Sequence, residues 1–283
     1  MILIIGATGN IGREVVSRLT VMGSKTRALS RNPEAASLPQ SIEVLAADLT
    51  RPETLDRCLD GVDTVFLVWT APPPTEAALE RIAHRAKRIV YLSAPLKVPH
   101  PFFQRPQPNP SSLLHAQIER LIETSGLHWT FLRPGMFALN ARWFWGPQIR
   151  AGDVVRWPDL AAPTAPIHER DIAAVAVRAL CEEGHGGAEY VLTGPESLSQ
   201  LEQVTTIGRV LGRSLRIEEI PPEEARRELE PIWGASVVDM LLVAWGAAIG
   251  QPAIVTPTVE EVTGSPPRTF LDWATDHAAE FRV

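Results

Sequence analysis

The sequence is poor in the residues that build covalent frameworks and metal centres. Its 283 residues include two cysteines, Cys58 and Cys181, and neither belongs to a C-x-x-C pair. This scarcity argues against a disulfide scaffold or a zinc site and is typical of a protein from a reducing compartment. Tyrosine is equally rare, with two residues in the chain. We therefore expect no metal ion at the functional site.

An excess of positive charge and long apolar segments are also missing. The formal net charge is −6, so a nucleic-acid-binding surface is not expected. No apolar stretch approaches the roughly 18–20 residues of a membrane span. The opening MILIIGATG lacks the basic start of a signal peptide. We expect a soluble, cytoplasmic protein, either a monomer or a homodimer, with no membrane or nucleic-acid partner.

The first half of the chain alternates strand-like and helix-like segments. Residues 1–5 form a continuous apolar run, which is typical of a strand buried on both faces of a parallel sheet. This alternation predicts an α/β fold, a doubly wound parallel sheet of the Rossmann type. Further strands are predicted at 25–30, 41–49, 62–69, 87–93 and 127–135, and helices at 10–23, 50–61, 74–86 and 111–126.

The second half is predicted to be mainly helical. A proline-rich segment, residues 95–110, precedes the last helix of the first half and is predicted to be a loop. After residue 136 we expect a smaller C-terminal lobe, with some segments returning to the Rossmann sheet. Its predicted helices are 168–184, 197–212, 221–229, 235–249 and 267–281, and its predicted strands are 188–194 and 214–220.

A glycine-rich turn, GATGNIG at residues 6–12, joins the first strand to the first helix. Glycines there permit a tight turn, close approach of the backbone to a pyrophosphate and close packing of helix on strand. The N-terminus of the following helix adds free N–H groups and a partial positive charge. We therefore predict a dinucleotide-binding site at this turn. The alternative is an ordinary turn whose glycines serve packing alone.

The segment RALSRNP, which ends the second predicted strand, bears on the choice of dinucleotide. Proteins that bind NAD usually place an acidic residue about 20 residues after the glycine fingerprint, and none precedes Arg31 here. Arginine suits a 2′-phosphate, and Ser30 adds a hydroxyl. We predict that NADPH is preferred over NADH. Alternatively, Arg31 is a solvated residue that stacks on adenine.

Taken together, several segments resemble the NmrA-like branch of the atypical short-chain dehydrogenases. They are GATGNIG, RALSRNP, AADLTRPETL, RIVYLSA, HAQIERLIETSGLHWTFLRPG and ERDIAAVA, with YVLTGPESLS and TGSPPRTFLDWATDHAAEF further on. The family includes NADPH-dependent quinone reductases, reductases of specialised metabolism and non-enzymatic redox sensors. The resemblance implies an NAD(P)-binding Rossmann domain at 1–136 and a C-terminal substrate lobe at 137–283.

The resemblance also implies contacts to the cofactor, all at the carboxyl ends of strands, where open α/β sheets bind ligands. The pyrophosphate would be lined by Gly6, Thr8, Gly9, Asn10, Ile11 and Gly12. Asp48 and Leu49 would flank the adenine, and Val68, Trp69 and Thr70 would back the ribose. Ser93, Pro134 and Gly135 would lie near the nicotinamide.

One departure from the dehydrogenase pattern concerns the proton donor. Ordinary members use Tyr-x-x-x-Lys, but here Tyr91 and Tyr190 are followed four places on by proline and glycine, and His115 and Glu119 stand at the expected positions. A histidine can supply a proton near neutrality, and a glutamate one turn away could raise its pKa and orient its ring. Ser93, His115 and Glu119 are the candidate catalytic residues. A packing role for His115 stays open, and the simpler expectation for Glu119 is a surface charge.

Aromatic residues after the sixth predicted strand are candidates for a substrate pocket. Such a cluster suits a flat apolar molecule, although packing between lobes or a dimer contact would explain it equally well. We predict an NADPH-dependent reductase that transfers a hydride to a small, flat, conjugated or aromatic acceptor, a quinone, enone or imine. A non-enzymatic NADP(H) sensor and an isomerase or epimerase are the alternatives. The pocket candidates are Phe137, Asn140, Trp143 and Phe144, with Met136 and Trp145 beside them, His168, and Phe102 with Phe103 from the proline-rich loop.

Overall fold

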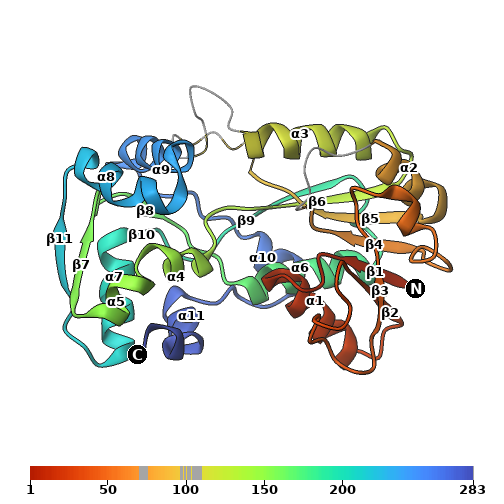
Figure 1. Cartoon of the computed structure of the whole chain (residues 1–283), viewed down its shortest axis with the longest axis horizontal. Coiled ribbons are helices and arrows are strands. Elements are labelled where there is room, and N and C mark those ends of the chain that lie inside the picture. Colours follow the sequence, from red (N-terminus) through yellow and green to blue (C-terminus); the bar gives the residue numbers. More distant parts are fainter. Residues whose placement is uncertain (70–75, 96–97, 99, 101–102, 104–109, 283) are drawn as a thin grey trace.

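A seven-stranded parallel sheet forms one end of the molecule in the computed structural model, which describes residues 1–69, 76–95, 98, 100, 103 and 110–282 (Figure 1). The strand order β3-β2-β1-β4-β5-β6-β9 reverses direction at β1, which confirms the doubly wound α/β fold. The strands are β1 (Ile2–Ile5), β2 (Thr26–Ser30), β3 (Glu43–Ala46), β4 (Thr64–Leu67), β5 (Arg88–Leu92), β6 (His128–Pro134) and β9 (Ala188–Leu192).

Helices cover both faces of this sheet because its strands carry apolar residues on both sides. Helices α1 (Asn10–Val21) and α6 (Glu169–Cys181) pack on the face formed by Ile4, Phe66 and Val90. The opposite face, with α2 (Glu76–Arg85) and α3 (Pro110–Glu123), buries the alternate residues of the same strands, such as Leu3, Val65 and Tyr91.

The predicted helix at residues 50–61 is wrong: it is a single 3-10 turn, η1 (Pro52–Leu55), followed by further turns. Short polar side chains compete there for the backbone groups that a helix would need. The Asp48 carboxylate accepts both the N–H and the hydroxyl of Thr50, and the Thr54 hydroxyl donates to the carbonyl of Arg51. Turn chemistry therefore overrides the apolar spacing of this segment.

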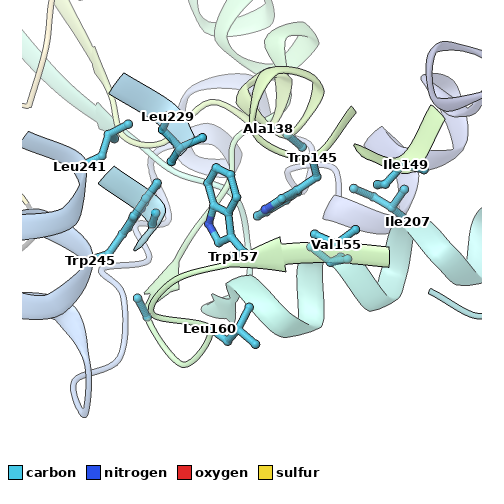
Figure 2. Close-up of a cluster of buried hydrophobic side chains, with 14 of the residues drawn as sticks. Ala138, Trp145, Ile149, Val155, Trp157, Leu160, Ile207, Leu229, Leu241 and Trp245 are labelled. Carbon is cyan, nitrogen blue, oxygen red and sulfur yellow. The ribbon is translucent and has the colours of Figure 1, made fainter. Parts of the chain in front are cut away.

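A second core lies at the other end of the molecule and is built around tryptophans. Trp145, Trp157 and Trp245 are fully buried together, with the ring centroids of Trp145 and Trp157 6.0 Å apart (Figure 2). The indole N–H of Trp157 donates to Gln200 at 2.7 Å, which satisfies it inside the core. The strand pairs β7–β11 and β8–β10 border this core. Of these, β11 was predicted at 214–220, whereas the short β7, β8 and β10 were missed.

The remaining elements are mostly helical. They are η2 (Ala138–Asn140), α4 (Ala141–Phe144), α5 (Gly146–Ala151), β7 (Val154–Trp157), β8 (Pro163–Thr164), β10 (Leu198–Ser199), α7 (Gln200–Leu211), β11 (Arg216–Glu219), α8 (Pro222–Trp233), α9 (Ala235–Ala248), α10 (Thr258–Thr263), α11 (Phe270–Asp276) and η3 (Ala278–Phe281). Two elements of this half are part of the Rossmann domain: strand β9 pairs with β6 in the sheet, and helix α6 packs on one face of the sheet. The division at residues 136/137 stays a prediction. Within the described ranges, no helix has the length and apolar character that a membrane crossing requires.

Candidate cofactor and active site

The glycine turn between β1 and α1 has two positions that no side chain can occupy. Gly6 has a φ of +87°, and a Cβ there would lie 2.7 Å from the Cβ of Val68. A Cβ on Gly12 would lie 2.1 Å from the Gly6 carbonyl oxygen. By contrast, a Cβ on Gly9 would lie 3.4 Å from that oxygen, so the protein itself tolerates a side chain there. The open space over Gly9 fits a ligand that approaches the backbone closely.

The N-terminus of α1 supplies the electrostatic part of the same site. Gly9 is the N-cap of this helix and has no side chain to bond the first N–H groups. Thr8, Gly9 and Asn10 are exposed, whereas the side chain of Ile11 is buried under the sheet. Unbonded N–H groups at an exposed helix start suit an anion, so this turn fits the pyrophosphate of a dinucleotide.

A clamp that sequence reasoning missed fixes the loop after β2 to the glycine turn. The Arg13 guanidinium donates to the carbonyl oxygens of Thr8 (2.9 Å), Ala36 (2.9 Å) and Ser37 (2.8 Å). Arg31 lies in the tethered loop and is exposed. For Arg13, the only signal in the sequence was its position on the first helix, directly after the last glycine of the turn.

The other predicted cofactor residues differ in their burial and in the hydrogen bonds that their side chains already make within the protein. The Ser30 hydroxyl is occupied within its own turn, where it bonds the backbone of Asn32. The Thr50 N–H and hydroxyl, with smaller help from Arg51 and Arg31, hold the pKa of Asp48 below its usual value. Leu49 and Trp69 are buried, and Thr70 lies outside the described residues.

The candidate catalytic residues meet at the carboxyl end of β5, but not as predicted. Glu119 is 4 % exposed, so the expectation of a surface charge is wrong. Its carboxylate accepts the Ser93 hydroxyl at 2.7 Å and two N–H groups of the Arg133 guanidinium, Nε at 2.9 Å and Nη2 at 2.8 Å. It makes no hydrogen bond to His115. Glu119 therefore orients Ser93 instead of the histidine.

Arg133 is the centre of this buried network. It lies in β6, is 2 % exposed and also pairs with Glu189 of β9. Burial lowers its pKa, but the bonds to Glu119 and Glu189 outweigh burial, so the pKa of Arg133 is raised overall. The guanidinium thus stays charged, and two carboxylates compensate it.

His115 has a different partner, which sequence reasoning also missed. Its Nδ1 lies 2.6 Å from the hydroxyl of Tyr91 on β5. Burial lowers the pKa of His115, and the opposing charge of Glu119 offsets this only in part. The prediction that Glu119 raises the pKa of His115 above its ordinary value is therefore wrong.

A small cleft with an open mouth and an enclosed volume of about 10 Å³ adjoins the end of β6. Its walls combine apolar groups with a few polar ones, as in small-molecule sites. Phe103, predicted as a possible cap, does line it. Of the residues predicted by resemblance, Gly135 lies on its wall, and Met136 lies beside Gly135. The lining residues are His100, Phe103, Gly135, Met136, Pro163, Thr164, Ala165, Thr193, Ala253 and Ile254.

Most predicted pocket residues lie elsewhere. Phe144 packs in the tryptophan core, where its ring centroid lies 5.5 Å from that of Trp245. Trp143 is 67 % exposed. His168 is buried as the N-cap of α6: its Nδ1 accepts the N–H of Arg170, and its Nε2 lies 3.3 Å from Asp276. Phe144 and His168 therefore do not line the cleft, and for His168 the equally open expectation of a structural role at a helix N-terminus is confirmed; a pocket role for Trp143 stays a prediction.

Two further predicted pocket residues play packing roles, and the third is not described. Phe137 packs against the tryptophan core and also against the sheet face that α1 and α6 cover. The amide of Asn140 contacts the sulfur of Met136. Phe102 lies outside the described residues. The cleft was missed because its walls come from segments far apart in sequence, around residues 100, 135, 164, 193 and 253.

The fold and the glycine turn define a dinucleotide-binding protein of the short-chain dehydrogenase type. The sequence profile of the NAD(P)H-binding family matches residues 6–183. The chain belongs to this family, in the NmrA-like branch of atypical short-chain dehydrogenases, and is an NAD(P)H-dependent oxidoreductase.

Three similar proteins illustrate this membership. A (4-alkanoyl-5-oxo-2,5-dihydrofuran-3-yl)methyl phosphate reductase of Streptomyces griseus is 40 % identical over 99 % of both chains. An NAD(P)H azoreductase of Xenophilus azovorans is 33 % identical, also over 99 % of both. The structure of an Escherichia coli NADPH-dependent quinone oxidoreductase complexed with NADPH has the same fold, with a TM-score of 0.81 and 23 % identity over 98 % of this chain and 99 % of that one.

Proposed function

We propose that the chain is an NADPH-dependent reductase of small, flat, conjugated acceptors. The observation that supports this proposal is the small cleft at the end of β6, whose lining includes Gly135 and Met136. Pro134 and Gly135 belong to the end of the sheet where dinucleotide folds bind the nicotinamide. A protein that only senses the cofactor would have no need of this additional cleft.

The preference for NADPH rests on the loop that carries Arg31. No acidic residue of β2 or the start of this loop is placed to bond a ribose 2′-hydroxyl, and Arg31 is exposed beside the glycine turn. The clamp by Arg13 fixes that loop before a cofactor binds, which lowers the entropic cost of binding. Bound at this turn, NADPH would supply a hydride to the acceptor.

The class of acceptor is supported by the chemistry that the related reductases share. The Streptomyces name describes a ring C=C bond conjugated to carbonyl groups, and the other names describe an azo group and a quinone. Each is an electron-poor π system that can take a hydride. In this chain the rings and apolar chains of Phe103, Met136 and Ile254 offer flat contact area, and Thr164 and Thr193 offer hydroxyl groups.

A cofactor titration followed by an acceptor screen tests this proposal. NADPH oxidation would be followed with a butenolide, a quinone, an azo dye and a cyclic imine. We expect NADPH to bind in the absence of any acceptor, and we expect it to be oxidised by at least one of the four. Tight NADPH binding with no oxidation by any acceptor would favour the NADP(H) sensor instead. A cytoplasmic location and a monomeric or homodimeric state stay predictions.

The cofactor preference has its own test in Arg31→Ala. Hydrogen bonds to charged groups contribute about 1.5–3 kcal/mol, so we expect NADPH affinity to fall about 10- to 100-fold while NADH affinity hardly changes. Arg57→Ala, at another exposed arginine, is the matched control. An equal loss for NADPH and NADH would refute a 2′-phosphate contact and support stacking on adenine.

A further inference from the structure

The pair of Tyr91 and His115 fixes which nitrogen of the histidine carries a proton. Tyr91 is fully buried between α3 and the sheet, and its hydroxyl lies 2.6 Å from Nδ1 of His115. Burial raises the pKa of Tyr91 far above its usual value, with a smaller contribution from Glu119. The phenol therefore stays protonated, and because Nδ1 is its one hydrogen-bond partner among the described residues, the hydroxyl donates to Nδ1. Nδ1 must then be an acceptor, which places the ring proton on Nε2.

The surroundings of His115 also keep the ring neutral. Tyr91 on β5 offers its hydroxyl, and Glu119, one turn on along α3, is the one charge among the described residues that acts on its pKa. That charge is shared with Arg133 and Ser93, so it favours an imidazolium weakly. Burial has the larger effect and lowers the pKa of His115. Protonation of Nδ1 would in addition leave the buried hydroxyl of Tyr91 without its acceptor.

The Nε2–H is the free end of this pair. Among the described residues, Nε2 of His115 has no hydrogen-bond partner, and the side chain is half-buried, not enclosed. It lies one turn from Glu119, whose carboxylate holds Ser93 at the end of β5. The Ser93 hydroxyl donates its hydrogen bond to that carboxylate and so offers the acceptor no donor. His115 is thus a donor at the end of the sheet where the nicotinamide is expected.

We propose that His115 is a neutral hydrogen-bond donor, locked by Tyr91 in its Nε2–H form, that holds the acceptor's carbonyl oxygen or azo nitrogen during reduction. The proposal rests on the reductase function above. When the acceptor's carbon, or one nitrogen of an azo group, takes the hydride, the π electrons move to the carbonyl oxygen or to the other nitrogen. The Nε2–H stabilises this charge through a preorganised hydrogen bond. Solvent water then supplies the proton that completes the product, and His115 keeps its own.

Nitrogen-15 NMR of the imidazole rings tests the tautomer without any turnover. We expect the His115 signals, assigned with His115→Gln, to show Nε2–H and unprotonated Nδ1 at pH 7 to 8, with and without NADPH, and a pKa below the ordinary value of about 6.5. Tyr91→Phe should give a mixture of tautomers and a higher pKa. Tyr190→Phe is the control, because Tyr190 bonds His185 at 2.7 Å in a separate pair. A wild-type His115 whose pKa is not below about 6.5, or that carries its proton on Nδ1, overturns the proposal.

Kinetics of His115 variants test the donor role with whichever acceptor is reduced. His115→Ala should lower kcat about 100-fold, and His115→Gln, which keeps an N–H donor, should stay within about tenfold of the wild type. A histidine acting as a proton donor would lose its function equally in both variants and would give the wild type an acid-dependent rate. Equal losses, or no loss in either, overturn the donor role. If no acceptor is reduced, the reductase function fails, while the NMR result still decides the tautomer.

Discussion

Replacing Glu119 by glutamine removes one charge from the buried network while keeping its shape. The amide oxygen of the new side chain can still accept the Ser93 hydroxyl, which now lies 2.7 Å from the carboxylate. Of the two bonds from Arg133, the one at 2.9 Å keeps only a neutral acceptor, and the one at 2.8 Å loses its acceptor because an amide NH2 takes the place of Oε2. Glu119→Gln therefore isolates the ion pair from the packing and from the serine contact.

The size of the effect follows from burial and from the second partner of Arg133. Breaking a buried ion pair by removing one partner costs about 3–5 kcal/mol, because an uncompensated charge is left behind. Arg133 keeps Glu189, whose side chain is about one-third exposed, so its charge is not left alone. We therefore expect a loss near the lower end, about 3 kcal/mol. At about 2–4 °C per kcal/mol in a chain of this size, the melting temperature should fall by about 6–12 °C.

Thermal and urea unfolding without cofactor would measure this loss. Glu183→Gln is the control: Glu183 pairs with Arg88 at 2.6 Å, but its side chain is 95 % exposed, so the change should cost under about 1 kcal/mol. Arg133→Met should cost more than Glu119→Gln, because it leaves two carboxylates facing each other without a cation. If Glu119→Gln is as mild as the surface control, the buried pair does not stabilise the fold and the reasoning is refuted.

Two further predictions concern the cofactor turn and the C-terminal segment. Gly9→Ala should keep the wild-type melting temperature but weaken NADPH binding at least tenfold, whereas Gly12→Ala should lower both, as thermal shift and titration would show. Burial lowers the pKa of His277, but bonds to Glu169 (2.6 Å) and Glu280 (2.7 Å) raise it overall. Their stabilisation is therefore complete below the unfolded pKa of about 6.5 and is lost as pH rises through the raised folded pKa. His277→Gln should cost most stability near pH 6 and little near pH 9.

The sequence was sufficient to predict the sheet and the cofactor turn because both depend on local patterns. Apolar runs such as residues 1–5 mark strands buried on both faces, and the glycine positions follow from the backbone geometry of one turn. The capping of α7 by Ser199 can also be predicted from the sequence, since a serine followed three places later by Glu202 is a local signal of a capping box. Each of these features is decided within about a dozen residues.

The active-site network could not be predicted because its partners are distant in sequence. Glu119 has the same local sequence whether it faces solvent or Arg133, which lies 14 residues away on the neighbouring strand. Glu189, which completes the charge balance, comes from a strand of the C-terminal half. Likewise, nothing around Tyr91 marks it as the partner of His115. Register between strands and helices decides these contacts, and register follows from the packed fold.

The network also explains why the conventional Tyr-x-x-x-Lys pair cannot be restored by changing two residues. In His115→Tyr/Glu119→Lys, the lysine ammonium would face the buried guanidinium of Arg133 in the place of its present counter-charge. We expect this double variant to unfold at much lower urea than the wild type and the addition of Arg133→Met to recover most of the loss. A double variant with an unchanged urea midpoint would contradict this account. Helix α3 and strand β6 therefore carry one linked set of charges, in which a glutamate at position 119 pairs with Arg133 and a lysine there would repel it.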